Sequence, residues 1–180
     1  YLENKSLDEA YCNFSELTKN VDGIIVMSGS INGLCGKLFN NGKLKYIDDI
    51  YKKLNEAYKD NFYIEIQRHG DQNEKTFEKY NLSLSGKLDI PIIASHETFY
   101  IDKSMHDAHD ALICIGNKSY LNDKNRLKYS RLHYLRSDEE LKEEFKDLPE
   151  ALENNYNLPI RCSFRPQASK PILPNISSEK

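Results

Sequence analysis

Two spacings of apolar residues alternate along this chain, and each predicts a different kind of secondary structure. In residues 44–57 the apolar positions recur every three or four residues, which predicts a helix with one buried face. In residues 62–67 they alternate, as in a strand that turns its isoleucines to one side. The continuous apolar run of residues 24–27 predicts a strand buried on both faces, and residues 87–94 lead into a third strand.

Local capping signals predict where further helices begin. Ser6 and Ser137 each stand three residues before a glutamate, which is the pattern of a capping box. The helix that begins at Ser6 is predicted to run to about residue 20. Pro149 fits the first turn of another helix, residues 150–155, because the missing N–H of proline costs little at that position.

Two further segments complete the pattern. Residues 106–115 predict a helix that turns Ala108, Leu112 and Ile115 inward. The segment SGSINGLCG, residues 28–36, is rich in small residues and predicts a tight loop. It is not a phosphate-binding P-loop, because the spacing GxxxxGK[ST] is missing.

The order of these elements predicts the fold class. A helix near residues 74–80 separates the second strand from the third, so helices and strands alternate through the first half of the chain. Such alternation is typical of an α/β fold with parallel strands covered by helices. Since only three strands are visible and a full β/α barrel needs more, we expect part of a barrel.

Length and composition narrow the class of protein. The chain has 180 residues and a net charge of −3, which does not indicate a general nucleic-acid binder. It has no apolar stretch of about 20 residues and no signal-peptide pattern at its start, so we expect a cytoplasmic protein without a membrane partner. Four widely spaced cysteines predict reduced, buried or partly buried thiols: Cys12, Cys35, Cys114 and Cys162.

Candidate metal ligands stand where two strands should end. His69 follows the strand that carries Glu65 and Gln67, and His96 and Glu97 follow the next strand. Parallel neighbours would bring both ends to one face, and imidazole with carboxylate suits zinc, manganese or iron. The structural alternative is that these are hydrogen-bonded or capping loop residues, because catalytic zinc sites usually have three protein ligands.

Two other polar groups allow both a functional and a structural interpretation. His106 and His109 lie three residues apart on a predicted helix and could share a metal, or could simply pack and hydrogen-bond. The basic residues of the segment 118–136 could contact DNA, although such runs are more often solvated loops. We favour the structural interpretation of both.

Six motifs, in order, carry a family resemblance. They are GIIVMSGSINGLCGK (23–37), FYIEIQRHG (62–70), DIPIIASHETFYID (89–102), DAHDALICIG (107–116), YLRSDEELKEEFKDLPEALENN (134–155) and RCSFRPQASKPILPNI (161–176). Together they resemble the polymerase-and-histidinol-phosphatase (PHP) domain of bacterial C-family DNA polymerase III alpha subunits. The resemblance implies a seven-stranded β/α barrel, with its C-terminal part in residues 1–163 and a linker toward the polymerase palm in residues 164–180.

The resemblance also implies a weakened metal site. His69 matches a family ligand, whereas the family's Asp-x-His pair aligns with Glu97 and Phe99, and a phenyl ring cannot bind a cation. His96 stands at a different position of the strand end. His69 and Glu97 would therefore be vestigial ligands. No catalytic residue and no cofactor is expected in this segment, although zinc or manganese would fit an intact PHP site.

For function, the resemblance implies a piece of a DNA-directed DNA polymerase, a nucleotidyltransferase of DNA replication. The palm with its magnesium, and thus DNA binding, would lie outside this chain. Relatives with degenerate sites serve as scaffolds that dock the proofreading exonuclease subunit, among other replicase subunits. The alternatives are a metal-dependent 3′–5′ exonuclease or phosphoesterase using His69 and Glu97, and a separate PHP-type phosphatase, which the tail in residues 164–180 argues against.

Overall fold

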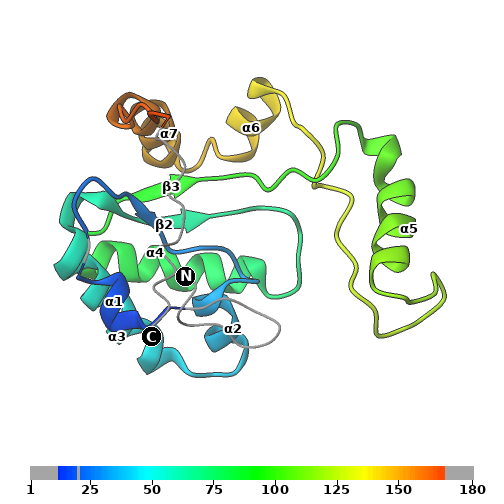
Figure 1. Ribbon diagram of the computed structural model, residues 1–180, viewed down its shortest axis with the longest axis horizontal. Helices are drawn as coiled ribbons and strands as arrows, with labels where there is room; N and C mark the ends of the chain where they lie inside the picture. The colour runs from blue at the N-terminus through cyan, green and yellow to red at the C-terminus, as the bar shows by residue number, and fades with distance from the viewer. Residues whose placement is uncertain (1–11, 20, 169–180) are drawn as a thin grey trace, which may run out of the picture.

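The computed structural model describes residues 12–19 and 21–168, and it has an α/β fold around a small parallel sheet (Figure 1). The strands lie in the order β1-β2-β3, with Val26 paired with Phe62 and Ile64 paired with Ile92. Their bounds are β1 (Val26–Met27), β2 (Phe62–Ile66) and β3 (Ile92–Ala94). The predicted parallel direction of the strands is therefore confirmed.

Helices from the first half of the chain pack beside the sheet and carry its core. Their bounds are α1 (Phe14–Leu17), α2 (Leu34–Asn40), α3 (Leu44–Tyr58), the 3₁₀ turn η1 (Lys59–Asn61) and α4 (Glu74–Leu88). The Tyr51 ring of α3 meets the Phe62 ring of β2 edge-on, and the Tyr51 hydroxyl donates to Asn81 of α4 at 3.1 Å. This satisfied hydrogen bond allows a tyrosine to lie in the core.

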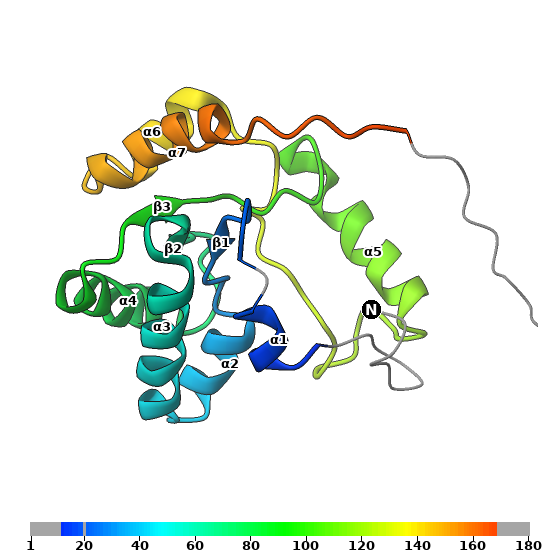
Figure 2. The same cartoon turned by 60° about the vertical axis from the view of Figure 1, so that its left-hand side comes forward.

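The C-terminal helices cover the outer edge of β3 (Figures 1 and 2). They are α6 (Asp138–Glu144) and α7 (Pro149–Arg161). Pro91 and Ser95 hydrogen-bond toward β2, so the carbonyl of Ile92 points away from it. Asn154 of α7 donates from Nδ2 to that carbonyl at 2.8 Å. Helix α7 thus satisfies a backbone carbonyl at the edge of the sheet. At an open edge this carbonyl would be available to pair with another strand.

An arm projects from this body and returns to it (Figures 1 and 2). It contains the 3₁₀ turn η2 (Lys103–Met105) and helix α5 (His106–Gly116). The chain then comes back through residues 117–136, and Tyr134 forms an isolated parallel bridge with Tyr100. The arm leaves and rejoins the body directly beside the end of β3.

Several sequence predictions are confirmed. Helix α3 buries its apolar stripe as expected, with Ile47, Tyr51, Leu54 and Tyr58 in the core. Ser137 forms the predicted capping box, since its Oγ accepts from the Glu140 amide at 3.2 Å and Glu140 reaches back. Pro149 occupies the first turn of α7, although that helix is longer than predicted.

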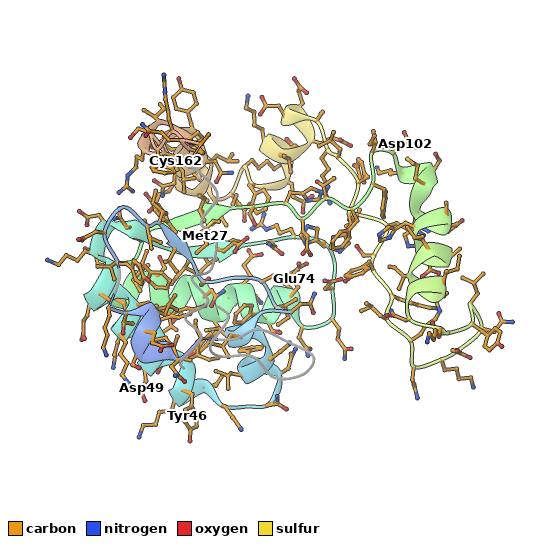
Figure 3. All side chains as sticks on the ribbon, viewed as in Figure 1. Met27, Tyr46, Asp49, Glu74, Asp102 and Cys162 are labelled. Carbon is orange, nitrogen blue, oxygen red and sulfur yellow. The ribbon has the colours of Figure 1, made fainter. Side chains whose placement is uncertain are left out.

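Other predictions are wrong. Strand β1 has two residues and is not buried on both faces, because Met27 is 47% exposed at an edge without a strand partner in the described residues (Figure 3). The segment predicted as a loop enters helix α2, where Cys35 and Gly36 are buried. A Cβ on Gly36 would lie 2.0 Å from the carbonyl of Ile31, so only glycine permits this close packing.

The prediction of which face of α5 is buried is also wrong, since Ala108, Leu112 and Ile115 point outward and are exposed. The opposite face of this short helix packs on the returning segment, and Cys114 is buried there. Periodicity located the stripe but could not tell what would cover it.

The cysteines are free, as expected, but only two of them are buried. Cys35 and Cys114 lie inside, whereas Cys12 and Cys162 are exposed. Burial raises the pKa of Cys35 to about 11, which keeps this thiol protonated and unreactive. In the part of the chain that the structure describes, no helix has the length and apolar character needed to cross a membrane.

Two predictions stay open at the ends of the chain. The capping box at Ser6 lies outside the described residues. The division into residues 1–163 and 164–180 also stays a prediction, and of the proposed linker only residues 164–168 are described.

Candidate functional site

The structure brings His69 and Glu97 together at the ends of β2 and β3. The backbone N–H of Glu97 donates to Nε2 of His69 at 3.0 Å, and the His69 ring is buried. This contact follows from the parallel pairing of adjacent strands, whose carboxyl ends meet at one edge of the sheet. The predicted proximity of the two strand ends is therefore found.

Glu74, at the start of α4, holds the turn that carries His69 (Figure 3). Its Oε2 accepts from the backbone N–H of His69 at 2.8 Å and of Gly70 at 2.7 Å, and its Oε1 lies 3.4 Å from Nδ1 of His69. Because Nε2 accepts a hydrogen bond, a neutral His69 carries its proton on Nδ1, facing Glu74. The lone pair that a metal would need is already used by the Glu97 amide.

His133, which the sequence analysis missed, completes this cluster. Its ring is fully buried and stacks on His69 with centroids 4.1 Å apart and an interplanar angle of 8°. Its Nδ1 lies 3.0 Å from the backbone carbonyl of Glu97, while Nε2 has no hydrogen-bond partner and lies 4.0 Å from Asp71. The only local signal was a histidine between Leu132 and Tyr134, which indicates burial but not a partner.

His96 and the inner face of β2 close the site from the other side. The His96 ring lies 4.7 Å from that of His69, and its Nε2 is 2.8 Å from the carbonyl of Tyr134. Directly after β2, Gln67 donates to Glu65 at 2.8 Å and to Ser95 at 3.0 Å. Glu65 and Gln67, predicted to stand near the site, are thus tied to the end of β3.

The surroundings shift the pKa of two histidines in opposite directions. For His133, burial disfavours the charged form, but the Asp71 carboxylate and the Glu97 carbonyl outweigh it and raise its pKa. The same contact with His133 lowers the pKa of Asp71. For His96, burial lowers the pKa, and the nearby His69 and Arg136 act in the same direction. Charge in the cluster is therefore favoured on His133 beside Asp71.

Phe99 lies where the resemblance aligns an imidazole ligand. Its ring stacks on His133 with centroids 4.8 Å apart and on His109 at 5.5 Å. A phenyl ring there packs between two imidazoles and offers no lone pair.

These side chains do not fit a metal ion as they are arranged. Among the described residues, no three His, Cys, Asp or Glu side chains are grouped so that they could hold one. His69 and Glu97 supply two candidate ligands, and Nε2 of His69 is engaged, whereas a catalytic zinc typically needs three protein ligands. That His69 and Glu97 are vestigial ligands stays a prediction.

The histidines of α5 have structural partners. His106 contacts Asp107 through Nδ1 at 2.9 Å and the carbonyl of Tyr129 through Nε2 at 3.2 Å. His109 stacks on Phe99. These contacts fit the structural interpretation of the pair.

Much of the positive charge in residues 118–136 is neutralised by ion pairs within the chain. Arg126 pairs with Asp110 and Arg131 with Asp107 on α5, and Arg136 pairs with Glu144 on α6. The arginines therefore fasten this segment to neighbouring helices, which favours its structural interpretation.

Comparison with known proteins shows what this chain is similar to. No family model matches the chain. It is 34% identical over 175 residues to DNA polymerase III subunit alpha of Rickettsia bellii, covering 96% of this chain and 15% of that protein. The chain is 29% identical to the same subunit of Caulobacter vibrioides, covering 97% of this chain and 15% of that protein. It is 32% identical to the subunit of Borreliella burgdorferi, covering 89% of this chain and 14% of that protein.

The chain thus spans about 15% of the length of the curated relatives it matches. The family resemblance seen in the motifs is confirmed: over nearly its whole length, this chain is homologous to one segment of the alpha subunit of bacterial DNA polymerase III.

Proposed function

We propose that this chain is a segment of the PHP domain of a DNA polymerase III alpha subunit and that it acts as a scaffold docking the proofreading exonuclease subunit. The observation that carries the scaffold role is the hydrogen bond from the Glu97 amide to Nε2 of His69, which occupies the candidate metal ligand. Homology over nearly the whole chain supports the parent protein.

The packing around the cluster supports a structural role. Nε2 of His69 accepts the Glu97 amide, Nδ1 lies 3.4 Å from Glu74, and Phe99 fills its position with stacking contacts. A metal-dependent exonuclease would need a free, correctly oriented set of ligands. The competing function, with His69 and Glu97 as working ligands, would require the Glu97 amide to move away first.

In this proposal, the rest of the parent protein supplies the remaining barrel strands and the polymerase palm. The parallel arrangement of β1, β2 and β3 agrees with part of a seven-stranded β/α barrel, and the exposed edge of β1 at Met27 is where a further strand would pair. Residues 1–163 would belong to the barrel and residues 164–180 would lead toward the palm. Polymerisation, with its magnesium and its contacts to DNA, would take place elsewhere in the parent.

Metal analysis of the full-length parent subunit tests the scaffold role. We expect less than about one tightly held zinc or manganese ion per chain after gel filtration, because a metal site needs more ligands than remain here. We also expect the subunit to co-elute with the proofreading exonuclease subunit. About three tightly bound ions together with metal-dependent 3′–5′ exonuclease activity would instead support the competing function.

A further inference from the structure

A cavity of about 270 Å³ lies between the end of β3 and the helices α6 and α7. Leu141, Phe145 and Leu152 form its apolar wall, and of these Phe145 is buried and the leucines are half-buried. Thr98 and Leu135 also line the cavity and are exposed, so it opens to solvent beside them. Drug-sized ligands occupy pockets of about 300 Å³ and more, so this cavity suits a single small ring.

One buried donor in the wall of the cavity has no partner. The side chain of Arg136 is 4% exposed, and its Nε has no hydrogen-bond acceptor among the described residues. The other guanidinium nitrogens are engaged, since Nη1 donates to Glu144 at 3.2 Å and Nη2 to the carbonyl of Arg68 at 3.4 Å. A buried N–H that lacks an acceptor is costly, and an acceptor on a bound molecule would remove that cost.

One buried acceptor in the same cavity is also unpartnered. Oδ1 of Asn155 is buried and receives no hydrogen bond from the described part of the chain. Asn154, one residue earlier on α7, already donates to the carbonyl of Ile92, so capping the sheet edge does not require Asn155. Because buried polar groups normally have partners, this pair of groups calls for a molecule that carries both an acceptor and a donor.

The charge of the cavity favours a neutral molecule. Glu144 balances the charge of Arg136, and the described lining residues include no aspartate, glutamate or lysine. An ion would therefore lose its hydration without gaining a counter-charge. One ordered water could bond to such groups, but a water takes up only about 30 Å³, a small part of the volume.

We propose that this cavity binds a neutral cyclic amide of about the size of a pyrimidine base. A ring carbonyl accepts from Nε of Arg136, a ring N–H donates to Oδ1 of Asn155, and the body of the ring packs against Phe145. A cyclic amide carries an acceptor and a donor side by side on an otherwise apolar ring. Neither His69 nor Glu97 lines the cavity, so the inference does not depend on the scaffold role.

Saturation-transfer NMR with uracil as the probe and the full-length parent subunit tests this assignment. We expect saturable binding with a dissociation constant of about 1 mM or below. Asn155→Leu should weaken it by at least about 10-fold, because the ring N–H loses its acceptor. This variant removes a buried acceptor without a partner, so it should fold at least as well as the wild type. The matched control is Asn157→Leu, which changes an exposed side chain of the same helix.

The outcomes separate this cavity from other sites of the subunit. 1,3-Dimethyluracil has the ring and carbonyls of uracil but no N–H, so it should also bind at least about 10-fold more weakly. Uracil binding that Asn155→Leu leaves within about 2-fold of the wild type belongs to another site and overturns the proposal. Equal weakening by Asn157→Leu, equal binding of the dimethyl analogue, or no saturable binding up to about 10 mM overturns it as well.

Discussion

Helices α3 and α5 have apolar stripes of the same spacing, yet the two stripes have opposite fates. On α3, Ile47 and Tyr51 are fully buried against β2 and α4. On α5, Leu112 and Ile115 face outward. The period of a sequence reveals that a helix has an apolar face, but what covers that face is a property of the tertiary structure or of a partner. The comparison separates residues that stabilise the body from residues that no described part of the chain covers.

Truncation of one apolar side chain in the body and one in the arm tests this difference most strongly. Phe62→Ala should lower the free energy of unfolding by about 3–5 kcal/mol, because it removes a fully buried ring from close-packed neighbours. Leu112→Ala should change it by less than about 0.5 kcal/mol. Urea unfolding followed by circular dichroism measures both, and a loss above about 1.5 kcal/mol for Leu112→Ala would mean that the stripe is buried after all.

The local part of this fold could be predicted, and the non-local part could not. The alternation in β2, the stripe of α3 and the capping box at Ser137 are each written within a few residues of sequence, and the structure has all three. Strand β1 was predicted too long, because its edge has no second neighbour among the described residues. The prediction of the buried face of α5 failed for the same reason, because the local pattern does not encode which part of the structure covers a helix face.

The candidate site shows the same limit. His69 and Glu97 were placed together because parallel neighbours end at one edge, a rule that needs only strand order. His133 stacks on His69 from the returning segment of the arm, and no spacing of residues in the sequence predicts this contact. The use of Nε2 of His69 by the Glu97 amide also depends on backbone positions that a sequence pattern does not encode.

Two arginines allow the comparison of body and arm to be sharpened. Arg68 pairs with Glu78 at 2.6 Å and with Asp147 at 2.7 Å, joining α4 to the segment before α7. Arg68→Met should cost about 2 kcal/mol of global stability, less than a fully buried pair because Asp147 is 60% exposed. Arg126 pairs with Asp110 within the arm.

Arg126→Met should therefore speed amide hydrogen exchange in α5 while exchange in β2 stays unchanged, because the arm can open locally. Hydrogen exchange read by mass spectrometry follows both helices and strands in one experiment. Equal acceleration in β2 would show that the arm and the body unfold as one unit, and it would remove the distinction drawn between them.

The smallest expected effect concerns pH, at the point where the arm returns to the body. Asp71 and the Glu97 carbonyl raise the pKa of His133 above its usual 6.5 despite burial, so its stabilising contribution is complete below pH 6.5 and is lost as pH rises through the folded pKa. Burial lowers the pKa of His96, so its contribution is present above 6.5 and is lost on acidification.

Because the two histidines oppose each other, the net change of stability across this range should be small in the wild type and should be unmasked by substitution. His96→Gln should leave a chain that is more stable at slightly acidic than at slightly alkaline pH, and His133→Gln should show the reverse. Histidine resonances in NMR titrations supply the direct measurement, with a midpoint above 6.5 for His133 and below 6.5 for His96. A single shared midpoint would mean that Asp71 does not hold the charge on His133.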